Sequence, residues 1–213
     1  MSENVEYLKG TTTVGIVCKD GIVLAADMRA TAGNLIVNKK TDKLYELSDD
    51  VIVTMAGTVS DAQLVLKWVK AELNLMRIRN NKIALVKEVA NLLGNIVYSN
   101  VRRMSLIPGV THFLLGGRDD NGFELYDVFA DGSVTLIDDF VSSGSGSVTA
   151  YGVLETQYNK NITVEEGIKL ALRSVNAALQ RDTYSGNGIN IAVVAKEGVK
   201  RVMSQELNTQ LKV

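Results

Sequence analysis

A threonine that follows a glycine near the start of the chain is the first residue whose position could do chemistry. Thr11 stands directly after Gly10 and begins a β-branched run that predicts a strand. A threonine hydroxyl is a weak nucleophile, but at the start of a cleaved chain the residue's own α-amino group can serve as its base. An unperturbed α-amine titrates near ~7.7–8.0, so much of it is ready to accept a proton at neutral pH. Thr11 is therefore a candidate N-terminal nucleophile, and an ordinary strand start is the alternative.

Three charged residues stand beside apolar stretches, where an unpaired charge would be costly. Asp27 and Arg29 directly follow the apolar stretch 22–26, which predicts a buried strand. This placement indicates either a functional site or a structural ion pair between the two. Lys43 precedes the short apolar run 44–47, where a lysine is typically an exposed charge that blocks unwanted strand pairing.

A glycine and serine loop invites a second functional interpretation. Gly144-Ser145-Gly146 lies between a predicted strand and a predicted helix, as in a dinucleotide-binding loop. The third glycine of that motif is missing, because Thr149 occupies its position, and no βαβ unit with a following acidic residue is present. The sequence also lacks a Gly-Lys-Ser/Thr phosphate-binding motif, so neither kind of nucleotide site is supported.

Two residue types that often carry chemistry occur only once. His112 begins an apolar strand, which favours a structural role over catalysis, and a metal site with several histidines is excluded. Cys18 lies in a mostly apolar strand and is expected to pack as a small hydrophobic residue rather than to react. We therefore expect no metal and no cofactor.

The composition limits the class of protein. The 213 residues suffice for one domain with a large core, and 46% hydrophobic and 22% charged residues are typical of a globular protein. A net charge of −1 gives no electrostatic case for binding nucleic acid or an anionic membrane. A single cysteine excludes an intrachain disulfide, and no apolar stretch approaches the ~18 residues of a membrane span. With no signal peptide in evidence, we expect a cytoplasmic protein.

The hydrophobic pattern predicts strands and helices in alternating blocks. Capping boxes at Ser60–Gln63 and Thr163–Glu166 mark the starts of two helices. In the first of these helices the expected apolar stripe is Leu64, Trp68, Leu75 and Met76. Such blocks indicate an α+β fold in which sheets lie between helical layers. The strands are expected at 12–18, 22–26, 35–37, 44–47, 51–56, 112–115, 123–129, 134–137, 189–195 and 199–203, and the helices at 60–77, 83–98, 148–158 and 163–181.

Several short motifs, in their shared order and spacing, closely resemble the β-type subunits of the archaeal proteasome core particle. The resemblance extends from Gly10 to about Met203, without a gap among the catalytic positions. Minor departures are Ser60, where some relatives carry glycine, and Ser142-Ser143, where threonine is common. The motifs are Gly-Thr-Thr-Thr-Val-Gly from Gly10, Asp27-Met28-Arg29, Lys43, Met55-Ala56-Gly57, Ser60-Asp61-Ala62-Gln63, the stretch from Gly144 to Glu155, and the stretch from Arg181 to Gly188.

The resemblance implies an N-terminal-nucleophile hydrolase fold, a four-layer α-β-β-α sandwich of two antiparallel sheets between helical layers. It implies that Thr11 is the nucleophile, that Asp27 holds Lys43 beside it, and that the backbone N–H of Gly57 binds the oxyanion. Arg29 would support the local architecture. The implied catalytic set is Thr11, Asp27, Lys43, Gly57, Ser145, Asp182 and Ser185, and the implied pocket for the substrate side chain is lined by Ala30, Thr41, Tyr45, Met55, Val59 and Gln63.

The resemblance also implies a maturation step and an assembly. Residues 1–10 would be a propeptide removed by autolysis between Gly10 and Thr11, and residues 11–213 a single domain. The implied activity is that of a threonine endopeptidase that degrades unfolded proteins to short peptides and prefers to cut after hydrophobic residues. Its partners would be other β subunits in a heptameric ring, proteasome α subunits and a regulatory ATPase, with no nucleic acid and no membrane. The alternative is a non-catalytic β subunit of the same ring.

Overall fold

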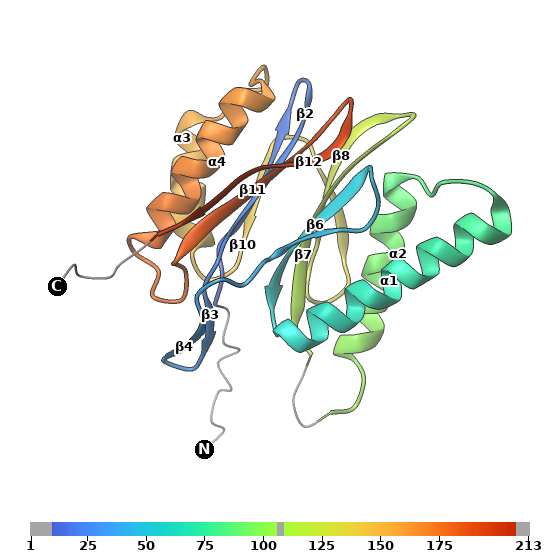
Figure 1. Cartoon of the computed structure of the whole chain (residues 1–213), viewed down its shortest axis with the longest axis horizontal. Coiled ribbons are helices and arrows are strands. Elements are labelled where there is room, and N and C mark those ends of the chain that lie inside the picture. Colours follow the sequence, from blue (N-terminus) through green and yellow to red (C-terminus); the bar gives the residue numbers. More distant parts are fainter. Residues whose placement is uncertain (1–9, 106–108, 208–213) are drawn as a thin grey trace.

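Two antiparallel sheets form the centre of the molecule in the computed structural model, which describes residues 10–105 and 109–207. Each sheet has five strands, and a separate hairpin of β3 (Ala30–Ala32) and β4 (Leu35–Asn38) extends from one end (Figure 1). The first sheet has the order β10 (Phe140–Ser143), β1 (Thr13–Cys18), β2 (Gly21–Asp27), β11 (Gly188–Ala195) and β12 (Gly198–Glu206). The second has the order β5 (Leu44–Glu46), β6 (Val51–Gly57), β7 (Thr111–Asp119), β8 (Gly122–Val128) and β9 (Val134–Ile137).

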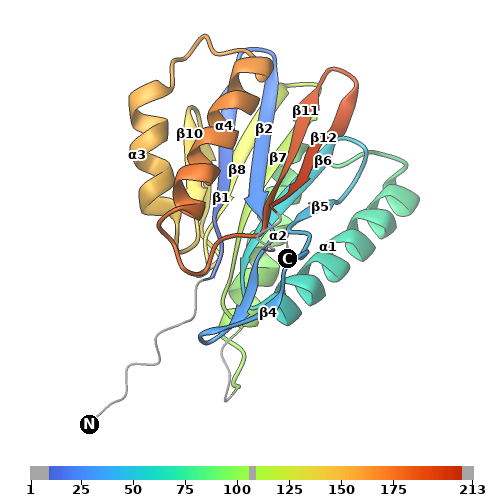
Figure 2. The same ribbon diagram turned by 60° about the vertical axis from the view of Figure 1, so that its left-hand side comes forward.

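Two pairs of helices cover the outer faces of the two sheets. The helices α3 (Ser147–Gln157) and α4 (Val164–Leu179) lie on the first sheet, and α1 (Val59–Asn80) and α2 (Val86–Val101) lie on the second (Figure 2). The expected four-layer order of helices, sheet, sheet and helices is therefore confirmed, and it is the arrangement of an N-terminal-nucleophile hydrolase fold.

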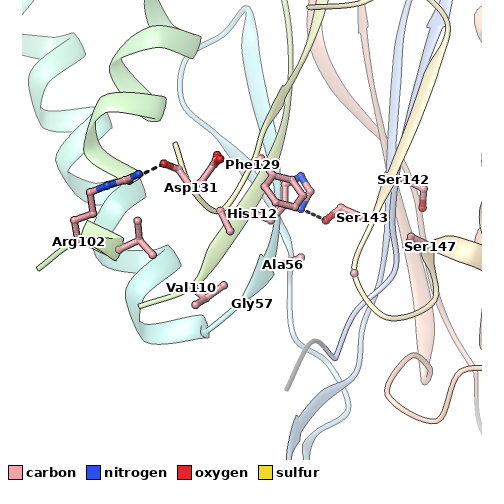
Figure 3. Close-up of a pocket in the computed structure, with 13 residues that line it drawn as sticks. Ala56, Gly57, Arg102, Val110, His112, Phe129, Asp131, Ser142, Ser143 and Ser147 are labelled. Atoms are coloured by element: carbon pink, nitrogen blue, oxygen red, sulfur yellow. Dashed lines mark hydrogen bonds between the residues drawn. The ribbon is translucent and has the colours of Figure 1, made fainter. Parts of the chain in front are cut away.

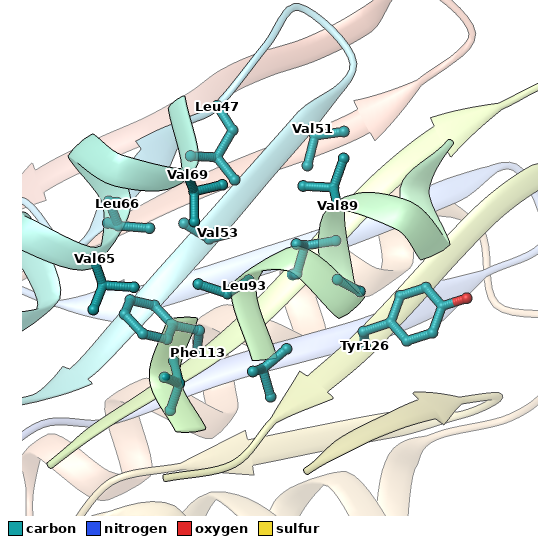
Figure 4. Packing of buried hydrophobic residues seen from close by; sticks show 14 of the residues in the cluster. Leu47, Val51, Val53, Val65, Leu66, Val69, Val89, Leu93, Phe113 and Tyr126 are labelled. Atoms are coloured by element: carbon teal, nitrogen blue, oxygen red, sulfur yellow. The ribbon is translucent and has the colours of Figure 1, made fainter. Parts of the chain in front are cut away.

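Three apolar clusters fill the three spaces between these four layers. One lies between the second sheet and its helices and includes Val65, Leu93 and Phe113 (Figure 4). Another lies between the first sheet and its helices, and the third lies between the two sheets. Each sheet thus buries both of its faces, as the continuous apolar strands of the sequence predict.

Alternation along β2 shows how one strand serves two layers. Ile22 and Leu24 point into the space between the sheets, whereas Val23 and Ala25 point toward α3 and α4. All seven residues of β2 are buried, including the terminal Asp27. A strand covered on both faces has no room for adjustment, so its last residue is held in a fixed place.

Helix α1 differs from the sequence-based prediction in its start and in its buried face. It begins at Val59 after Thr58, which makes no side-chain cap, so the predicted capping box at Ser60 is wrong. The hydroxyl of Ser60 instead bonds the neighbouring carboxylate of Asp61. The buried face is Ala62, Val65, Leu66 and Val69, whereas the predicted stripe residues Leu64, Trp68 and Leu75 are exposed.

The physical reason for this error is that α1 carries two apolar sets. Both sets follow helical spacing, so periodicity alone does not decide which one faces the sheet. The smaller set is buried because its alanine and valines let the helix approach the sheet closely, and the larger side chains stay outside. Elsewhere the expected capping box of α4 is confirmed, since the Thr163 hydroxyl accepts from the N–H of Glu166 and the Glu166 carboxylate accepts from the N–H of Thr163.

Two short strands of the fold were absent from the sequence-based prediction. These are β3 and β10, and each is only a few residues long. Strand β10 forms the edge of the first sheet and ends at Ser143, directly before the glycine and serine loop. The predicted leader, residues 2–9, lies outside the described residues.

Candidate active site

The ends of several strands meet at one edge of the double sheet. In the first sheet Thr13 pairs with both Ala26 and Ser143, and Asp27 pairs with Ile189. This register brings the start of β1 together with the ends of β2 and β10 and the start of β11. In the second sheet β6 ends at Gly57, which also lines a cavity beside Thr11. Residues that are far apart in the sequence therefore converge around Thr11.

A hydrogen-bonded chain of three side chains forms the centre of this site. The ammonium group of Lys43 lies 2.9 Å from the hydroxyl oxygen of Thr11 and 2.6 Å from Oδ1 of Asp27. All three residues are buried, with exposed fractions of 3% for Thr11, 2% for Lys43 and 0% for Asp27. The interpretation of Lys43 as an exposed edge charge is therefore wrong. The lysine side chain enters the interior because a carboxylate there offsets the cost of burying its charge.

Asp27 is held by backbone groups as well as by Lys43. Its Oδ1 accepts from the N–H of Thr12 at 3.0 Å, and its Oδ2 accepts from the N–H groups of Arg29 and Gly186, both at 2.9 Å. Three backbone donors from separate segments thus fix both oxygens of the carboxylate. They therefore hold the carboxylate in the orientation in which Oδ1 meets the Lys43 ammonium group.

Burial and the aspartate act in opposite directions on Lys43. Burial is the larger influence and lowers the pKa of Lys43 below its ordinary value of 10.5, while the nearby Asp27 carboxylate raises it. A lysine with a lowered pKa releases its proton more readily than an exposed one. Lys43 can therefore donate to the Thr11 oxygen and also take part in moving a proton there.

The backbone N–H of Thr11 leads into a second network of hydroxyl groups and a carboxylate. It donates to the hydroxyl of Ser145 at 3.3 Å, and that hydroxyl donates to Oδ2 of Asp182 at 2.5 Å. Ser185 donates to the same carboxylate oxygen at 2.6 Å. The 2.6 Å contact between Ser185 and Thr12 is then a bond that Thr12 donates, because the Ser185 proton is already used. The three residues Ser145, Asp182 and Ser185 are thus brought together at the nitrogen of Thr11.

Two glycines near Thr11 stand where the backbone is closely packed. Gly144 has φ +93°, and a Cβ atom there would lie 2.0 Å from the carbonyl oxygen of Thr11. Gly57 has φ +102°, and a Cβ atom there would lie 2.2 Å from the carbonyl oxygen of Val110. Any other residue would be strained at both positions and would have to displace backbone atoms.

Arg29 does not form the ion pair with Asp27 that one interpretation of the sequence expected. Its Nε donates to Oδ1 of Asn187 at 2.9 Å, and its Nη1 donates to the carbonyl oxygen of Thr183 at 2.7 Å. Arg29 therefore braces the segment that carries Asp182 and Ser185, while Asp27 takes Lys43 as its partner.

A cavity of about 40 Å³ lies directly beside the Thr11 hydroxyl. Three of the expected pocket residues, Ala30, Met55 and Val59, line it. The other three, Thr41, Tyr45 and Gln63, are not among its lining residues. Thr41 donates its N–H to the carbonyl of Met28, Tyr45 packs on the core beneath α1, and Gln63 is exposed on that helix. Their assignment to the substrate pocket stays a prediction.

A much larger cavity, of about 630 Å³, lies on the other side of Gly57 (Figure 3). It shares Ala56 and Gly57 with the small cavity, but Thr11 is not among its lining residues. The small cavity is the better candidate for the reacting group, because it contains the Thr11 hydroxyl and Lys43.

Comparison with known proteins agrees with this geometry. A family model described as "Proteasome subunit" matches residues 7–194. The chain belongs to the proteasome subunit family. It is 45% identical over 199 residues to a proteasome subunit beta of Methanothermobacter thermautotrophicus, an alignment that covers 93% of this chain and 92% of that protein. It is 42% identical over 207 residues to a proteasome subunit beta of Methanocaldococcus vulcanius, which covers 97% of this chain and 91% of that protein. It is also 42% identical over 203 residues to a proteasome subunit beta of Methanobrevibacter smithii, which covers 95% of this chain and 96% of that protein.

The proteasome-family site contains a hydrogen-bonded group that the sequence did not reveal. His112, Asp127 and Ser143 form it, and they come from β7, β8 and β10. The position of His112 at the start of an apolar strand favoured a structural role, and the pattern of that strand did not show which side chains face the histidine across the sheets. Only the alternation of β8, which places Asp127 between buried neighbours, was a signal for one of its partners.

Within residues 10–105 and 109–207, no three His, Cys, Asp or Glu side chains are grouped so that they could hold a metal ion. In the same residues no helix is both long and apolar enough to cross a membrane.

Proposed function

We propose that this chain is a threonine endopeptidase subunit of a proteasome core particle. The observation that carries the proposal is the buried Thr11, Lys43 and Asp27 chain, in which a cation lies 2.9 Å from the hydroxyl oxygen of Thr11. The family membership supports a protease. The hydrogen bond from the Thr11 N–H to Ser145, which Asp182 and Ser185 extend into a network, supports a reaction in which that nitrogen takes part. A purely structural subunit has no use for such an arrangement.

In the proposed reaction the freed amine of Thr11 accepts the proton of its own hydroxyl group. The Thr11 oxygen then bonds to the carbonyl carbon of the substrate peptide, and the Gly57 N–H donates to the oxyanion that develops there. The carbon–nitrogen bond breaks, and the leaving amine takes up the proton. Water then hydrolyses the ester and restores the hydroxyl group. Lys43 stabilises the oxygen as it loses its proton, and Asp27 keeps Lys43 in place.

The proposal includes removal of residues 1–10 before the enzyme can act, leaving a single domain of residues 11–213. The Thr11 hydroxyl contacts the carbonyl oxygen of Gly10, so the nucleophile already lies beside the bond to be cut. Gly10 has no side chain to obstruct the approach, and a Cβ atom there would lie 2.6 Å from the Thr31 hydroxyl. This arrangement supports autolysis between Gly10 and Thr11.

The small cavity supports a preference for cleavage after hydrophobic residues. Ala30, Met55 and Val59 give it apolar walls, and among the described residues no acidic side chain lines it to attract a basic residue. Arg29 and Lys43 also line it, but both are already engaged by hydrogen bonds. A buried charge without a partner would cost several kcal/mol there.

We further propose that the chain works in an assembly. The similar proteins are β subunits by name, and the family resemblance adds a heptameric ring of β subunits, flanking α subunits and a regulatory ATPase that delivers unfolded polypeptides. Exposed apolar side chains along α1, with exposed fractions of 39% for Leu64, 44% for Trp68 and 78% for Ile78, are consistent with neighbouring subunits. Such an enzyme would act in the cytoplasm. A non-catalytic β subunit is the alternative.

One experiment tests the activity and the maturation together. The wild-type chain and Thr11→Ala would be assembled with α subunits, and each particle would be analysed by intact mass and with matched fluorogenic peptides ending in Tyr, Arg or Glu. We expect the wild-type chain to begin at Thr11 and to cut fastest after Tyr, and the variant to keep residues 1–10 and to be inactive. Equal activity of the two particles would contradict the proposed nucleophile, and an inactive wild-type particle would favour the non-catalytic alternative.

A further inference from the structure

His112 connects the two sheets at the edge where the candidate active site lies. Its Nε2 lies 2.5 Å from Oδ1 of Asp127 on the neighbouring strand β8, and its Nδ1 lies 2.6 Å from the hydroxyl of Ser143 on β10 (Figure 3). Strands β7 and β8 belong to the second sheet, whereas β10 is the edge strand of the first. The ring also contacts Phe129 edge to face, with 4.7 Å between the ring centroids. The imidazole is therefore oriented from three sides.

The partners of the ring determine where its protons lie. The carboxylate of Asp127 only accepts hydrogen bonds, so Nε2 carries the proton and donates to it. In the neutral ring Nδ1 then has a free lone pair and accepts the proton of the Ser143 hydroxyl. The bond is thus directional, from Ser143 to His112 and from His112 to Asp127.

Two members of this hydrogen-bonded group, His112 and Ser143, are next to groups of the proposed reaction. His112 pairs in register with Ala56, the residue before Gly57. Ser143 is followed by Gly144 and Ser145, which contact the carbonyl oxygen and the N–H of Thr11. The bond between His112 and Ser143 therefore sets the spacing between the strand that carries the proposed oxyanion donor and the loop that holds the nucleophile.

We propose that His112 is a positioning residue of the peptidase. Together with Asp127 it holds Ser143, and through Ser143 it keeps the loop at Gly144 at a fixed distance from Gly57. The inference rests on the proposed function. Because the small cavity that takes the substrate side chain is not lined by His112, losing the residue should lower kcat and leave KM nearly unchanged.

The test uses the assembled particle and variants of both partners of the bond. His112→Phe and Ser143→Ala each remove it, and the double variant removes nothing further. His112→Asn keeps an amide oxygen near the place of Nδ1 and should restore part of the activity. The matched control is Ser142→Ala, because the neighbouring Ser142 hydroxyl is also buried but donates to the carbonyl of Thr13. Rates are expressed per chain whose mass begins at Thr11.

We expect His112→Phe and Ser143→Ala each to lower kcat about tenfold, with KM within about twofold, and the double variant to be no slower than the slower single one. The losses from His112→Phe and Ser142→Ala should instead multiply. Losses that multiply for His112 and Ser143, or a change confined to KM, would overturn the inference, as would full activity of both single variants. If the His112→Phe particle does not assemble, Ser143→Ala alone removes the bond, and its full activity would overturn the inference. An inactive wild-type particle, or an active Thr11→Ala particle, would instead count against the proposed function.

Discussion

The buried pair of Asp27 and Lys43 predicts an unequal cost of removing its two members. The change Lys43→Met removes the cation and keeps an apolar side chain of similar length. Asp27 then keeps its three backbone donors, so the carboxylate loses only one of its partners. The change Asp27→Asn removes the anion but leaves the volume nearly unchanged. Whichever way the new amide is turned, its NH₂ group faces two donors, either Lys43 with the N–H of Thr12 or two backbone N–H groups.

The magnitudes follow from burial and from the number of broken hydrogen bonds. Removing one partner of a buried ion pair costs about 3–5 kcal/mol in the free energy of unfolding, and the low end applies to Lys43→Met because the carboxylate stays hydrogen-bonded. Asp27→Asn in addition leaves hydrogen-bond donors facing the amide nitrogen, and each donor left without an acceptor costs about 1–3 kcal/mol. We therefore expect Asp27→Asn to destabilise the chain by at least about 2 kcal/mol more than Lys43→Met. The double variant should cost less than the sum of the two, because it no longer buries an unpaired ammonium group.

Urea unfolding followed by far-UV circular dichroism measures these differences. All four proteins must be compared in the same assembly state and at one protein concentration, because association adds to the apparent stability. Equal costs for the two single variants, or a larger cost for Lys43→Met, would refute the idea that Asp27 is the member fixed by the surrounding backbone. Additive costs in the double variant would refute the burial of a charged pair.

Three further predictions concern single residues. Lys43→Arg should abolish peptidase activity nearly as completely as Lys43→Ala, because a planar guanidinium group does not fit where a compact ammonium group contacts Thr11, and near-normal hydrolysis by the arginine variant would reject this role. Gly144→Ala should lower activity at least about 100-fold, because the new Cβ atom would lie 2.0 Å from the Thr11 carbonyl oxygen. The control Gly122→Ala is also at positive φ, but its Cβ atom would meet nothing within 4 Å, so it should affect stability alone. Burial raises the pKa of Cys18 to about 12, so only about 10⁻⁴ of the thiol is ionised at pH 8. Alkylation by iodoacetamide should therefore be far slower in the folded protein than in urea, and comparable rates would contradict that burial.

Much of the fold could be predicted from the sequence because its strands and helices carry strong local signals. The apolar runs that became β1, β2, β6 and β11 are continuous, so they indicated strands covered on both faces. The helices α2 and α4 have one dominant apolar face, and their prediction was close to the observed bounds. The short strands β3 and β10 were not predicted because their local signal is weak. A strand of a few residues is defined by the strands that it pairs with and not by its own pattern.

The site was only partly accessible from the sequence. Local patterns placed Asp27 at the end of a buried strand, but they favoured an exposed Lys43, and only the family resemblance put that lysine next to Thr11. The long-range packing of the sheets decides such questions, because Lys43 directly precedes β5 of the second sheet and its ammonium group reaches Asp27 at the end of β2 in the first. The same limitation hid the bond between His112 and Ser143, whose two strands belong to different sheets.

The aspartate explains how separate segments come to act as one site. Its three backbone donors belong to Thr12 directly before β1, Arg29 after the end of β2, and Gly186 before β11. A carboxylate that accepts from all three can be satisfied only when these segments are in place, so the position of Lys43 depends on the completed sheet. The lysine in turn reaches the Thr11 hydroxyl, and the nucleophile acquires its cation only in the folded chain. If the proposed function holds, cleavage before Thr11 is therefore restricted to molecules that have already folded.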